Sequence, residues 1–518
     1  MKLKHVFKIV LNIFNVFTKV IIFLLSLAVQ INIFWVSLFS AYDYGIVVHI
    51  VTICLSAIPI VHIYNSSNNS SFKMSWIILI LITPVLGSIL YLLFGQGRSF
   101  SGHKAKRFKE YASSQLPTND AIKSIRNLDD KKYVNLLHNC SYLPFYLDKE
   151  VMFLNDGEIW FNHLIEDIKN ATKYVFLEYF VISDGYVLDT LSNILLQKAD
   201  EGVEIRIILD DIGSKRKLKQ KSIDRLNSHK NIHVYSFNPM GLFFSLNLNF
   251  RNHRKIAVID GKVAYCGGTN LADEYVHKTN RFGYWRDNCC KYSGPAIKSF
   301  IYIFSIDWYM STKIKLDIEQ YIDPQTDSIV YNIEEDKNYI CPFSDGPGDD
   351  LNPGYSLIKA LIQNAKKSIY ISTPYFIIDR DFITTLENAA LSGIDVRILI
   401  PSIPDKKAIY AMTYYHIGRL IKSGVKVYRY TPGFNHAKNI IVDDKYSLCG
   451  TFNLDYRSLF LHFECGAFHI NKKLTNELKN DFYYAINKSQ LIDYNTWKKR
   501  PILIRIVEFI GSLIAPLL

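Results

Sequence analysis

A chain of 518 residues, 49% of them hydrophobic, is long enough for two to four domains with large apolar cores. Its formal net charge of +12 favours polyanions such as nucleic acid, anionic lipid headgroups or phosphorylated substrates, without choosing among them. The eight cysteines form no Cys-x-x-Cys pair and no Cys/His cluster with zinc spacing. This argues against a zinc-binding module and favours reduced, buried thiols.

Residues 1–96 are predicted to form a membrane region. Three apolar runs of about 20 residues, each long enough to cross ~30 Å of hydrocarbon as a helix, occupy Val20–Ser40, Gly45–Tyr64 and Met74–Phe94. The apolar stretch is too long for a secretory signal, and no small-x-small cleavage site follows it cleanly. The pattern therefore predicts a multi-pass protein anchored in the cell membrane.

Basic residues flank this region on both sides, whereas the loops between the runs contain only Lys73. The flanking residues are Lys2, Lys4, Lys8 and Lys19 before it, and Arg98, Lys104, Lys106, Arg107 and Lys109 after it. The positive-inside rule places both flanks, and hence the catalytic domain, in the cytoplasm, which requires an even number of crossings. Of the three runs, the first, with Gln30 and Asn32 in its middle, is the best candidate for an interfacial or re-entrant segment.

After a basic linker at 97–139, two similar α/β/α halves are predicted at 140–330 and 331–497. In the first, Asn155-Asp156-Gly157 introduces a helical run, which is followed by KYVFLEYFVISDG, a second helix and GVEIRIILDDIGS. In the second, Ser344-Asp345-Gly346 introduces a helical run, KSIYISTPYFIIDRD, a second helix and GIDVRILIPSIPD. Apolar strands alternating with helices indicate a mostly parallel sheet covered on both faces. Two such halves can associate about a pseudo-two-fold axis.

Each half then repeats one pattern of five polar and glycine positions. His253, Lys255, Asp260, Gly267 and Asn270 recur as His436, Lys438, Asp443, Gly450 and Asn453, with offsets of +2, +7, +14 and +17 from each histidine. One His-x-Lys-x4-Asp occurrence is weak evidence, because such residues are usually a surface feature of a strand. Coincidence does not reproduce the register in two copies 183 residues apart. Imidazole, ammonium and amide groups are those that handle a phosphate.

Strand geometry predicts how each motif is arranged. Side chains alternate across a strand, so the histidine and the lysine two residues later point the same way. Asp260-Gly261 and Asp443-Asp444 are predicted to form turns, after which return strands lead to the motif glycines. A glycine there lets two backbones approach closely, where the motif asparagines aim their amides inward. The pseudo-two-fold axis would bring both motifs into one cleft.

The motifs read HRKIAVIDGKVAYCGGTN and HAKNIIVDDKYSLCGTFN. This resembles the phospholipase D superfamily, whose signature is two HxKx4Dx6GxxN elements. Stretches that are similar to bacterial cardiolipin synthases include EYF, DDIGS, GYWRD, TPYF and NLDYRSLFLHFE, and together the similar stretches span nearly the whole chain. One feature departs from the family: serine often follows the motif glycine, and here Gly268 and Thr451 stand there.

The residue types support phosphodiester exchange without a cofactor or a metal. One histidine can attack phosphorus while the other protonates the leaving oxygen and later activates a hydroxyl. The residues alone do not assign these roles, whereas the resemblance implies His253 as nucleophile and His436 as acid. Catalytic roles are predicted for both lysines and for Asp260 and Asp443, and phosphate binding for Asn270 and Asn453. For the two motif aspartates, stabilisation of a buried turn is the competing interpretation.

The resemblance also implies residues outside the motifs. Asp287 and Glu464 look like the carboxylates that orient the histidines, across or within the halves. Tyr179 and Tyr375 are either cleft-lining or ordinary strand aromatics, and Arg251 either adds charge near a headgroup or is an exposed arginine without a ligand.

The function implied is a cardiolipin synthase that transfers a phosphatidyl group between two phosphatidylglycerol molecules, releasing glycerol, through a phosphohistidine. The partners are then phosphatidylglycerol and anionic membrane lipid, with no nucleic acid. A phospholipase D hydrolase, a phosphatidylserine- or phosphatidylethanolamine-forming transferase, a membrane-tethered nuclease and a non-catalytic lipid-binding scaffold are the alternatives. The amphipathic C-terminal segment 498–518 fits either an interfacial helix on an anionic surface or a helix packed on the globular domain.

Overall fold

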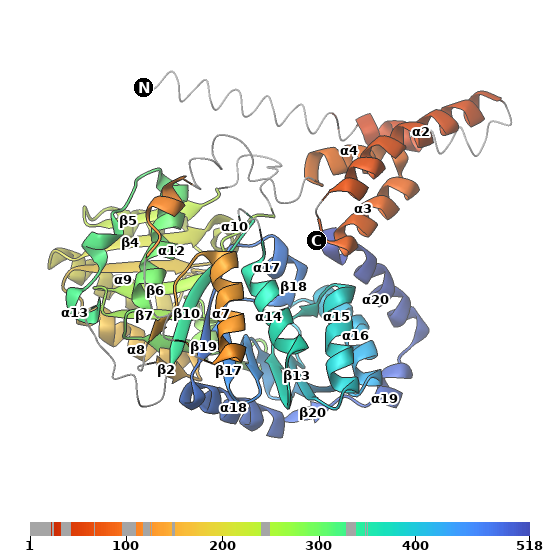
Figure 1. Ribbon diagram of the computed structural model, residues 1–518. Coiled ribbons are helices and arrows are strands. Elements are labelled where there is room, and N and C mark those ends of the chain that lie inside the picture. Colours follow the sequence, from red (N-terminus) through yellow and green to blue (C-terminus); the bar gives the residue numbers. More distant parts are fainter. Residues whose placement is uncertain are drawn as a thin grey trace, which may run out of the picture. The chain divides into compact units, whose positions relative to one another are not determined.

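The computed structural model describes residues 22, 25–32, 43–66, 68–95, 110–117, 125, 127–147, 151–239, 249–327, 338–347, 349 and 351–517. The chain divides into two compact units. The helical unit comprises Met1–Ser99, Met240–Asn249 and Ser512–Leu518, and the α/β unit comprises Phe100–Pro239 and Phe250–Gly511. Figure 1 shows the elements of each. Apart from residues 240–249, both predicted halves fall within the α/β unit.

The described part of the helical unit includes three helices and a short 3-10 turn. They are α2 (Asp43–Asn65), α3 (Ser70–Ile82), α4 (Pro84–Phe94) and the turn η3 (Ala515–Leu517). Asn69 starts α3 by accepting the N–H of Ser71 at 2.9 Å. The rings of Trp76 and Tyr91 meet edge to face at 5.4 Å in a small buried cluster. Apolar contacts between α3 and α4 thus hold these short helices together.

The prediction of N-terminal transmembrane helices is contradicted. Among the helices that the structure describes, none combines the length and the apolar character needed to span a bilayer. The third predicted run is divided at Thr83–Pro84 into helices of 13 and 11 residues. The break occurs at Pro84 because proline cannot continue the helical hydrogen bonds. At ~1.5 Å per residue, the longer of the two helices is only ~20 Å long. Most of the first run, Val20–Ser40, lies outside the described residues.

The first half of the α/β unit is built on a seven-stranded sheet with the order β2-β9-β7-β6-β3-β4-β5. Its strands are β2 (Val151–Leu154), β3 (Tyr174–Tyr179), β4 (Glu204–Asp210), β5 (Ile232–Phe237), β6 (Lys255–Ile259), β7 (Val263–Gly267) and β9 (Cys289–Tyr292). On one face, Val175 and Leu177 pack with α8 (Gly157–Lys169) and α9 (Tyr186–Asp200). On the other, Phe176 stacks on Phe304 of α12 (Ile297–Thr312), with the ring centres 4.4 Å apart.

The second half repeats this order as β10-β19-β17-β16-β11-β13-β14 and adds β1 and β20 at the two edges. Its strands are β1 (Tyr146–Leu147), β10 (Tyr339–Asp345), β11 (Ser368–Ser372), β13 (Asp395–Pro401), β14 (Lys426–Tyr430), β16 (Asn439–Val442), β17 (Tyr446–Gly450), β19 (Glu464–Ile470) and β20 (Ser489–Leu491). Its helices include α14 (Pro353–Gln363), α15 (Arg380–Leu391), α16 (Lys407–Lys422) and α18 (Lys472–Asn487). The matching orders confirm the two repeated halves of the predicted α/β fold.

The sheets are less parallel than the sequence predicts. Within the seven-stranded and the nine-stranded sheet, the described strands that pair in parallel are β3-β4-β5 and β11-β13-β14, whereas the motif strands β6, β7, β16 and β17 pair antiparallel with their neighbours. The predicted turn after β6 is present, with φ of 54° at Asp260 and 68° at Gly261. Positive φ at two successive residues suits a tight hairpin. Each motif is therefore an antiparallel hairpin beside a parallel unit.

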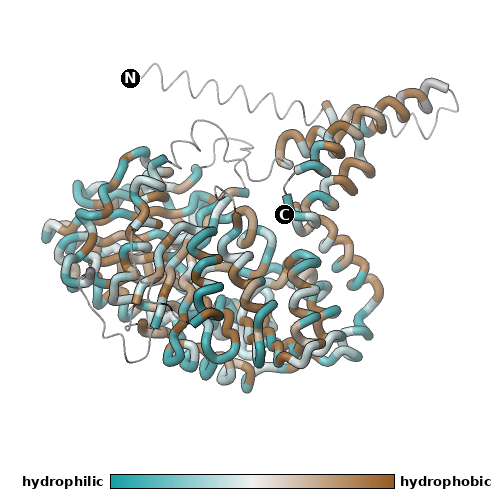
Figure 2. The backbone as a smooth tube through the Cα atoms, in the orientation of Figure 1, coloured by the Kyte–Doolittle hydropathy of each residue, from teal (hydrophilic) through white to brown (hydrophobic). Residues whose placement is uncertain are grey.

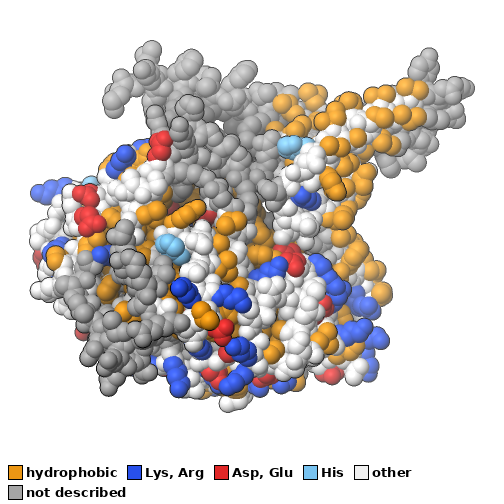
Figure 3. Space-filling view, in the orientation of Figure 1, with side chains coloured by type: hydrophobic (Ala, Val, Ile, Leu, Met, Phe, Trp, Pro, Cys, Tyr) orange, Lys and Arg blue, Asp and Glu red, His pale blue; other side chains and the backbone are white. Residues whose placement is uncertain are grey.

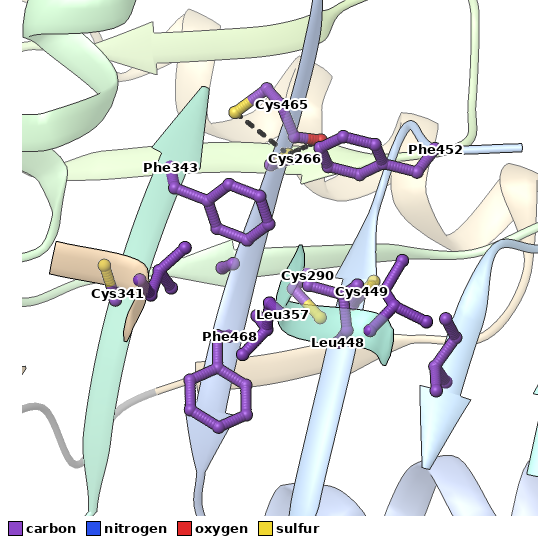
Figure 4. Close-up of a cluster of buried hydrophobic side chains, with 14 of the residues drawn as sticks. Cys266, Cys290, Cys341, Phe343, Leu357, Leu448, Cys449, Phe452, Cys465 and Phe468 are labelled. Carbon is purple, nitrogen blue, oxygen red and sulfur yellow. Dashed lines mark hydrogen bonds between the residues drawn. The ribbon is translucent and has the colours of Figure 1, made fainter. Parts of the chain in front are cut away.

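The two halves share one apolar core, and buried cysteines lie where their sheets meet (Figure 4). Cys266 of β7 and Cys465 of β19 have sulfur atoms 3.8 Å apart. The neighbouring Cys465 and burial raise the pKa of Cys266 well above 9.0, and Cys290 and burial do the same for Cys449. All eight cysteines are free thiols, and only Cys54 is exposed. These residues are small packing side chains rather than reactive groups.

Candidate active site

Both motif hairpins present histidine and lysine in the same way. The Lys255 ammonium donates to the backbone oxygen of His253, and the Lys438 ammonium donates to that of His436. All four side chains are largely buried. The motif glycines lie against a neighbouring strand, since a Cβ at Gly267 would stand 2.5 Å from the Cα of Cys289. The expected close approach of backbones is thus present.

The ring of His253 is oriented by a residue from the other half. Its Nδ1 lies 2.8 Å from Oε1 of Glu464 and 3.0 Å from Oε2. Its backbone N–H donates to the carbonyl of Phe463 at 2.9 Å, so the segment that supplies the carboxylate runs beside the motif. An acceptor at Nδ1 leaves Nε2 as the nitrogen that faces a substrate.

His436 is oriented by the reciprocal arrangement. Its Nδ1 lies 2.6 Å from Oδ2 of Asp287, and its N–H donates to the carbonyl of Arg286 at 2.7 Å. Strands β8 (Tyr284–Arg286) and β15 (Gly433–Asn435) pair in parallel and bring these residues together. Lys438 Nζ lies 2.8 Å from the same Nδ1, so lysine and aspartate compete for one ring nitrogen. The sequence left open whether each carboxylate orients the histidine of its own half or that of the other half. In the structure, each orients the histidine of the other half.

The residue after each motif glycine contacts the orienting carboxylate. A Cβ at Gly268 would lie 2.0 Å from Oδ1 of Asp287, so only glycine leaves room there. The hydroxyl of Thr451 contacts the Glu464 carboxylate and accepts the N–H of Cys465 at 3.0 Å. The departure from the usual serine therefore matches the different carboxylates that the two histidines use.

Burial controls the charges of this site. Burial, reinforced by Lys255, lowers the pKa of His253 well below its usual 6.5, and burial raises the pKa of Glu464 to about 8. Burial and Lys438 lower the pKa of His436 to about 4, while Asp287 opposes that shift. Charges from the second motif also contribute to the shift at His253. The two motifs therefore share one electrostatic environment, in which both imidazoles are neutral near pH 7.

The motif asparagines differ in their contacts. Oδ1 of Asn270 accepts the N–H of Val181 at 3.0 Å, and its Nδ2 donates to the hydroxyl of Tyr275 at 2.6 Å. Asn453 is 5% exposed, and its buried Oδ1 has no hydrogen-bond partner within the described residues. Asn453 is thus the asparagine with unused hydrogen-bonding capacity, whereas Asn270 is held by the protein.

The motif aspartates lie at the far end of the strands from the histidines. Asp260 accepts backbone N–H groups from Thr172, Lys173 and Tyr174 at 2.7–2.8 Å. Asp443 accepts those of Lys366, Lys367 and Ser368 at 2.7–3.0 Å. Seven residues of extended chain place Asp260 roughly 20 Å from His253. These contacts favour the turn-stabilising interpretation over direct catalysis.

We expect Asp260→Ala to weaken folding by roughly 2–4 kcal/mol, because several N–H donors lose their acceptor. Turnover per folded molecule should stay within a few-fold of that of the native protein. Urea unfolding and activity under native conditions measure the two effects separately. A large loss of turnover with unchanged stability would restore the catalytic role predicted for Asp260.

Several residues near the histidines escaped the sequence interpretation. Phe180 meets the ring of His253 edge to face at 4.8 Å. Tyr275, Trp285 and Phe434 have ring centres 5.2–5.7 Å from that of His436. Together with Phe282 and Tyr375 they form one aromatic cluster. The signal was already in the sequence, because Phe180 stands inside the recognised element EYF and Trp285 inside GYWRD.

Three other assignments are now clear. Tyr179 points into the core, 6.2 Å from the ring of Trp160, whereas Tyr375 belongs to the aromatic cluster. Arg251 is buried and pairs with Asp210 at 2.9 Å, so it is a structural residue rather than an exposed one.

One possible metal-binding group occurs in the described part of the chain. His253, His462 and Glu464 each offer a ligand atom, and these atoms lie within 4.8 Å of one another. The His462 ring centre is 5.4 Å from that of His253. Lys255, Lys438 and Arg457 bring positive charge to the same place and lower the pKa of His253 or His462. Such surroundings suit an anion better than a metal cation.

Comparisons with known proteins agree with this geometry. A family model described as "Cardiolipin synthase, PLD-like domain" matches residues 164–283 and 358–486, so that each match includes one motif, and another described as "Phospholipase_D-nuclease N-terminal" matches 54–96. The chain is 33% identical to a cardiolipin synthase of Alkalihalophilus pseudofirmus over 88% of this chain and 91% of that protein. It is 34% identical to one of Halalkalibacterium halodurans over 90% of this chain and 93% of that protein. The solved structure of phosphatidylserine synthase from Haemophilus influenzae Rd KW20 has a similar fold, with a TM-score of 0.57 and 18% identity over 75% of this chain and 100% of that one.

Proposed function

Because the chain belongs to the cardiolipin synthase family with its phospholipase D-like domain, we propose that it joins two phosphatidylglycerol molecules into cardiolipin and glycerol. The observation that carries this proposal is the reciprocal arrangement of the histidines. Each imidazole turns one nitrogen toward a carboxylate from the other half, and two lysines lie beside them. Of two histidines oriented in this way, one can attack the phosphorus while the other transfers the proton to the leaving oxygen.

In the first step, Nε2 of His253 attacks the phosphorus of one phosphatidylglycerol. The P–N bond forms as the P–O bond to glycerol breaks, and Nε2–H of His436 protonates the departing oxygen. The phosphodiester is an anion, and its charge raises the pKa of His436 toward the range in which that ring carries a proton. In its ionised form, Glu464 accepts the Nδ1–H of His253 and stabilises the positive charge that develops on this ring, and that charge in turn favours ionisation of Glu464 although burial raises its pKa to about 8.

In the second step, neutral His436 removes the proton from a hydroxyl of the second phosphatidylglycerol. That oxygen attacks phosphorus, the P–N bond breaks and His253 is regenerated. The ammonium groups of Lys255 and Lys438 and the Nδ2 amide of Asn453 donate to the non-bridging oxygens, where negative charge grows in the transition state. The aromatic cluster beside His436 offers apolar contact for the glycerol backbone and limits access of water. Water attack instead of lipid attack would give phosphatidic acid.

The test is purified protein with phosphatidylglycerol, followed by mass spectrometry of lipids and glycerol. Cardiolipin and glycerol in equal amounts, formed also in excess chelator, are the expected products. Phosphatidic acid as the main product would assign hydrolysis, and added serine or ethanolamine tests the other acceptors. Unchanged phosphatidylglycerol with cleaved DNA would overturn the lipid function.

Raising the pH is expected to lower kcat/KM well before ordinary lysines titrate. Burial lowers the pKa of Lys255 to about 7 and that of Lys438 to about 8, so their phosphate-binding charge is lost as the pH rises through this window. In Lys255→Arg the guanidinium stays charged, and the alkaline limb should move upward. Profiles of kcat/KM against pH for both proteins check this. An unmoved limb would show that another group sets it.

A further inference from the structure

The last long helix of the chain exposes far more apolar surface than an ordinary surface helix. Helix α20 (Ile502–Ile514) exposes a run of large apolar side chains, each 45–73% accessible, namely Ile502, Leu503, Ile504, Ile506, Val507, Phe509 and Ile510. Figure 2 shows the helix as a hydrophobic coil, and Figure 3 shows its apolar side chains next to lysines and arginines. An exposed apolar area of this kind marks an interaction site.

One side of α20 is apolar and uncovered. At 100° per residue, Leu503, Val507 and Ile510 share one face, whereas Glu508 lies on the other side of the helix. Glu508 is the buried residue of the stretch, at 2% exposure. The helix therefore turns its Glu508 side toward the protein and leaves the face of Leu503, Val507 and Ile510 uncovered. The apolar face of residues 502–510 is therefore not packed on the globular domain, which was one of the two interpretations of the C-terminal segment.

Specific contacts fix α20 to the α/β unit. Arg500 donates to Oε1 of Glu508 at 2.5 Å, and its guanidinium lies 4.3 Å from the ring centre of Trp497. Phe509 contacts Tyr415 of α16, with ring centres 6.1 Å apart. At the other end of α16, the N-cap residue Lys406 lies 5.7 Å from the ring centre of Tyr375. One helix thus connects α20 with the aromatic cluster beside His436.

We propose that α20 is a docking helix that lies in the headgroup region of an anionic phospholipid bilayer and sets the position of the active site relative to that surface. Lys498, Lys499 and Arg505 are exposed cations on α20 or just before it, and this positive charge matches an anionic lipid surface better than a protein partner. This inference rests on the proposed function only in taking phospholipid as the substrate. Depth in the bilayer is independent of turnover.

The first test measures depth. An environment-sensitive fluorophore is attached to Val507→Cys in full-length protein carrying Cys54→Ser, since the other seven cysteines are buried. The matched control is Leu391→Cys in α15, which is 71% exposed in the native protein. With phosphatidylglycerol vesicles, the probe at 507 should shift to a low-polarity spectrum and be quenched by lipid-borne quenchers, while the probe at 391 should not. A probe at 507 that stays in water with bound vesicles overturns the proposal.

A probe at 507 that is shielded before lipid is added would also overturn it. If the protein then sediments as a dimer, a second copy covers the helix, and if it sediments as a monomer, the chain itself covers it. Because this readout needs no catalysis, an inactive protein with a lipid-embedded probe would refute the proposed function and leave the docking helix standing.

The second test separates docking from chemistry. Val507→Glu places a charge on the apolar face and should lower turnover of phosphatidylglycerol in vesicles by at least about tenfold, the cost of withdrawing one large side chain from the membrane. Turnover of a short-chain, monomeric phosphatidylglycerol should be unchanged. Leu391→Glu should affect neither. Equal losses on both substrates would place the defect in folding or chemistry, and no loss on vesicles would contradict the docking role.

Discussion

Replacing His253 or His436 by alanine is expected to lower phosphatidyl transfer by roughly 10⁴–10⁶-fold. The proposed reaction has no second nucleophile or second acid, so each substitution blocks both half-reactions. Loss of activity alone does not reveal which histidine attacks. A substrate that needs no acid separates the two roles.

A phosphatidyl ester of p-nitrophenol supplies that substrate, because nitrophenolate leaves without being protonated. With this ester, His436→Ala should release about one equivalent of nitrophenolate per active site as a burst. The protein should then carry a phosphatidyl group on His253, because no base activates the second hydroxyl. His253→Ala should show no burst and no modified protein. Rapid mixing and intact-protein mass spectrometry measure both quantities.

A control for folding is His233→Ala, which removes an exposed histidine of β5 and should keep native activity. Thermal unfolding of all three variants checks that the fold survives. A burst from His253→Ala and none from His436→Ala would exchange the two roles. Bursts of equal size from both variants would remove the two-histidine mechanism.

The sequence predicted the repeated halves and the motif hairpins because both depend on local patterns. Identical offsets place histidine and lysine at the start of a short strand and an aspartate at the turn that ends it. The two large sheets have the same strand order: β2-β9-β7-β6-β3-β4-β5 in the first half corresponds to β10-β19-β17-β16-β11-β13-β14 in the second. Pairing direction was missed, since apolar runs look alike in parallel and antiparallel strands.

Features that depend on packing between distant segments escaped prediction. A carboxylate 34 residues from one histidine and a carboxylate 28 residues from the other look local, yet Asp287 and Glu464 each serve the histidine of the opposite half. The apolar run Met74–Phe94 likewise predicted one membrane-spanning helix, although a new helix begins at Pro84. The role of Asp260 also needed the structure, because its partners at residues 172–174 lie at the bend that leads into β3, far from Asp260 in the sequence.

Asp287→Asn and Glu464→Gln are each expected to lower turnover of phosphatidylglycerol by roughly 10²–10⁴-fold, although neither carboxylate touches phosphorus. An amide keeps the size but loses the charge and offers an N–H where the ring needs an acceptor. The ring can then adopt the wrong tautomer. Glu464→Gln disturbs the attacking nitrogen of His253, whereas Asp287→Asn disturbs the acid, whose pKa the Asp287 charge helps to raise.

The crossed geometry makes a prediction that a carboxylate within the same half would not make. On the nitrophenyl ester, Asp287→Asn should regain a fast burst, because its defect lies in proton transfer by His436. Glu464→Gln should stay slow, because its defect lies in attack by His253. A carboxylate acting on the histidine of its own half would give the opposite pattern. A Cβ at position 268 would collide with the Asp287 carboxylate, so Gly268→Ala should push that carboxylate away from His436 and reproduce the Asp287→Asn pattern. If Gly268→Ala instead kept the native turnover and the native burst, the position of this carboxylate would not matter.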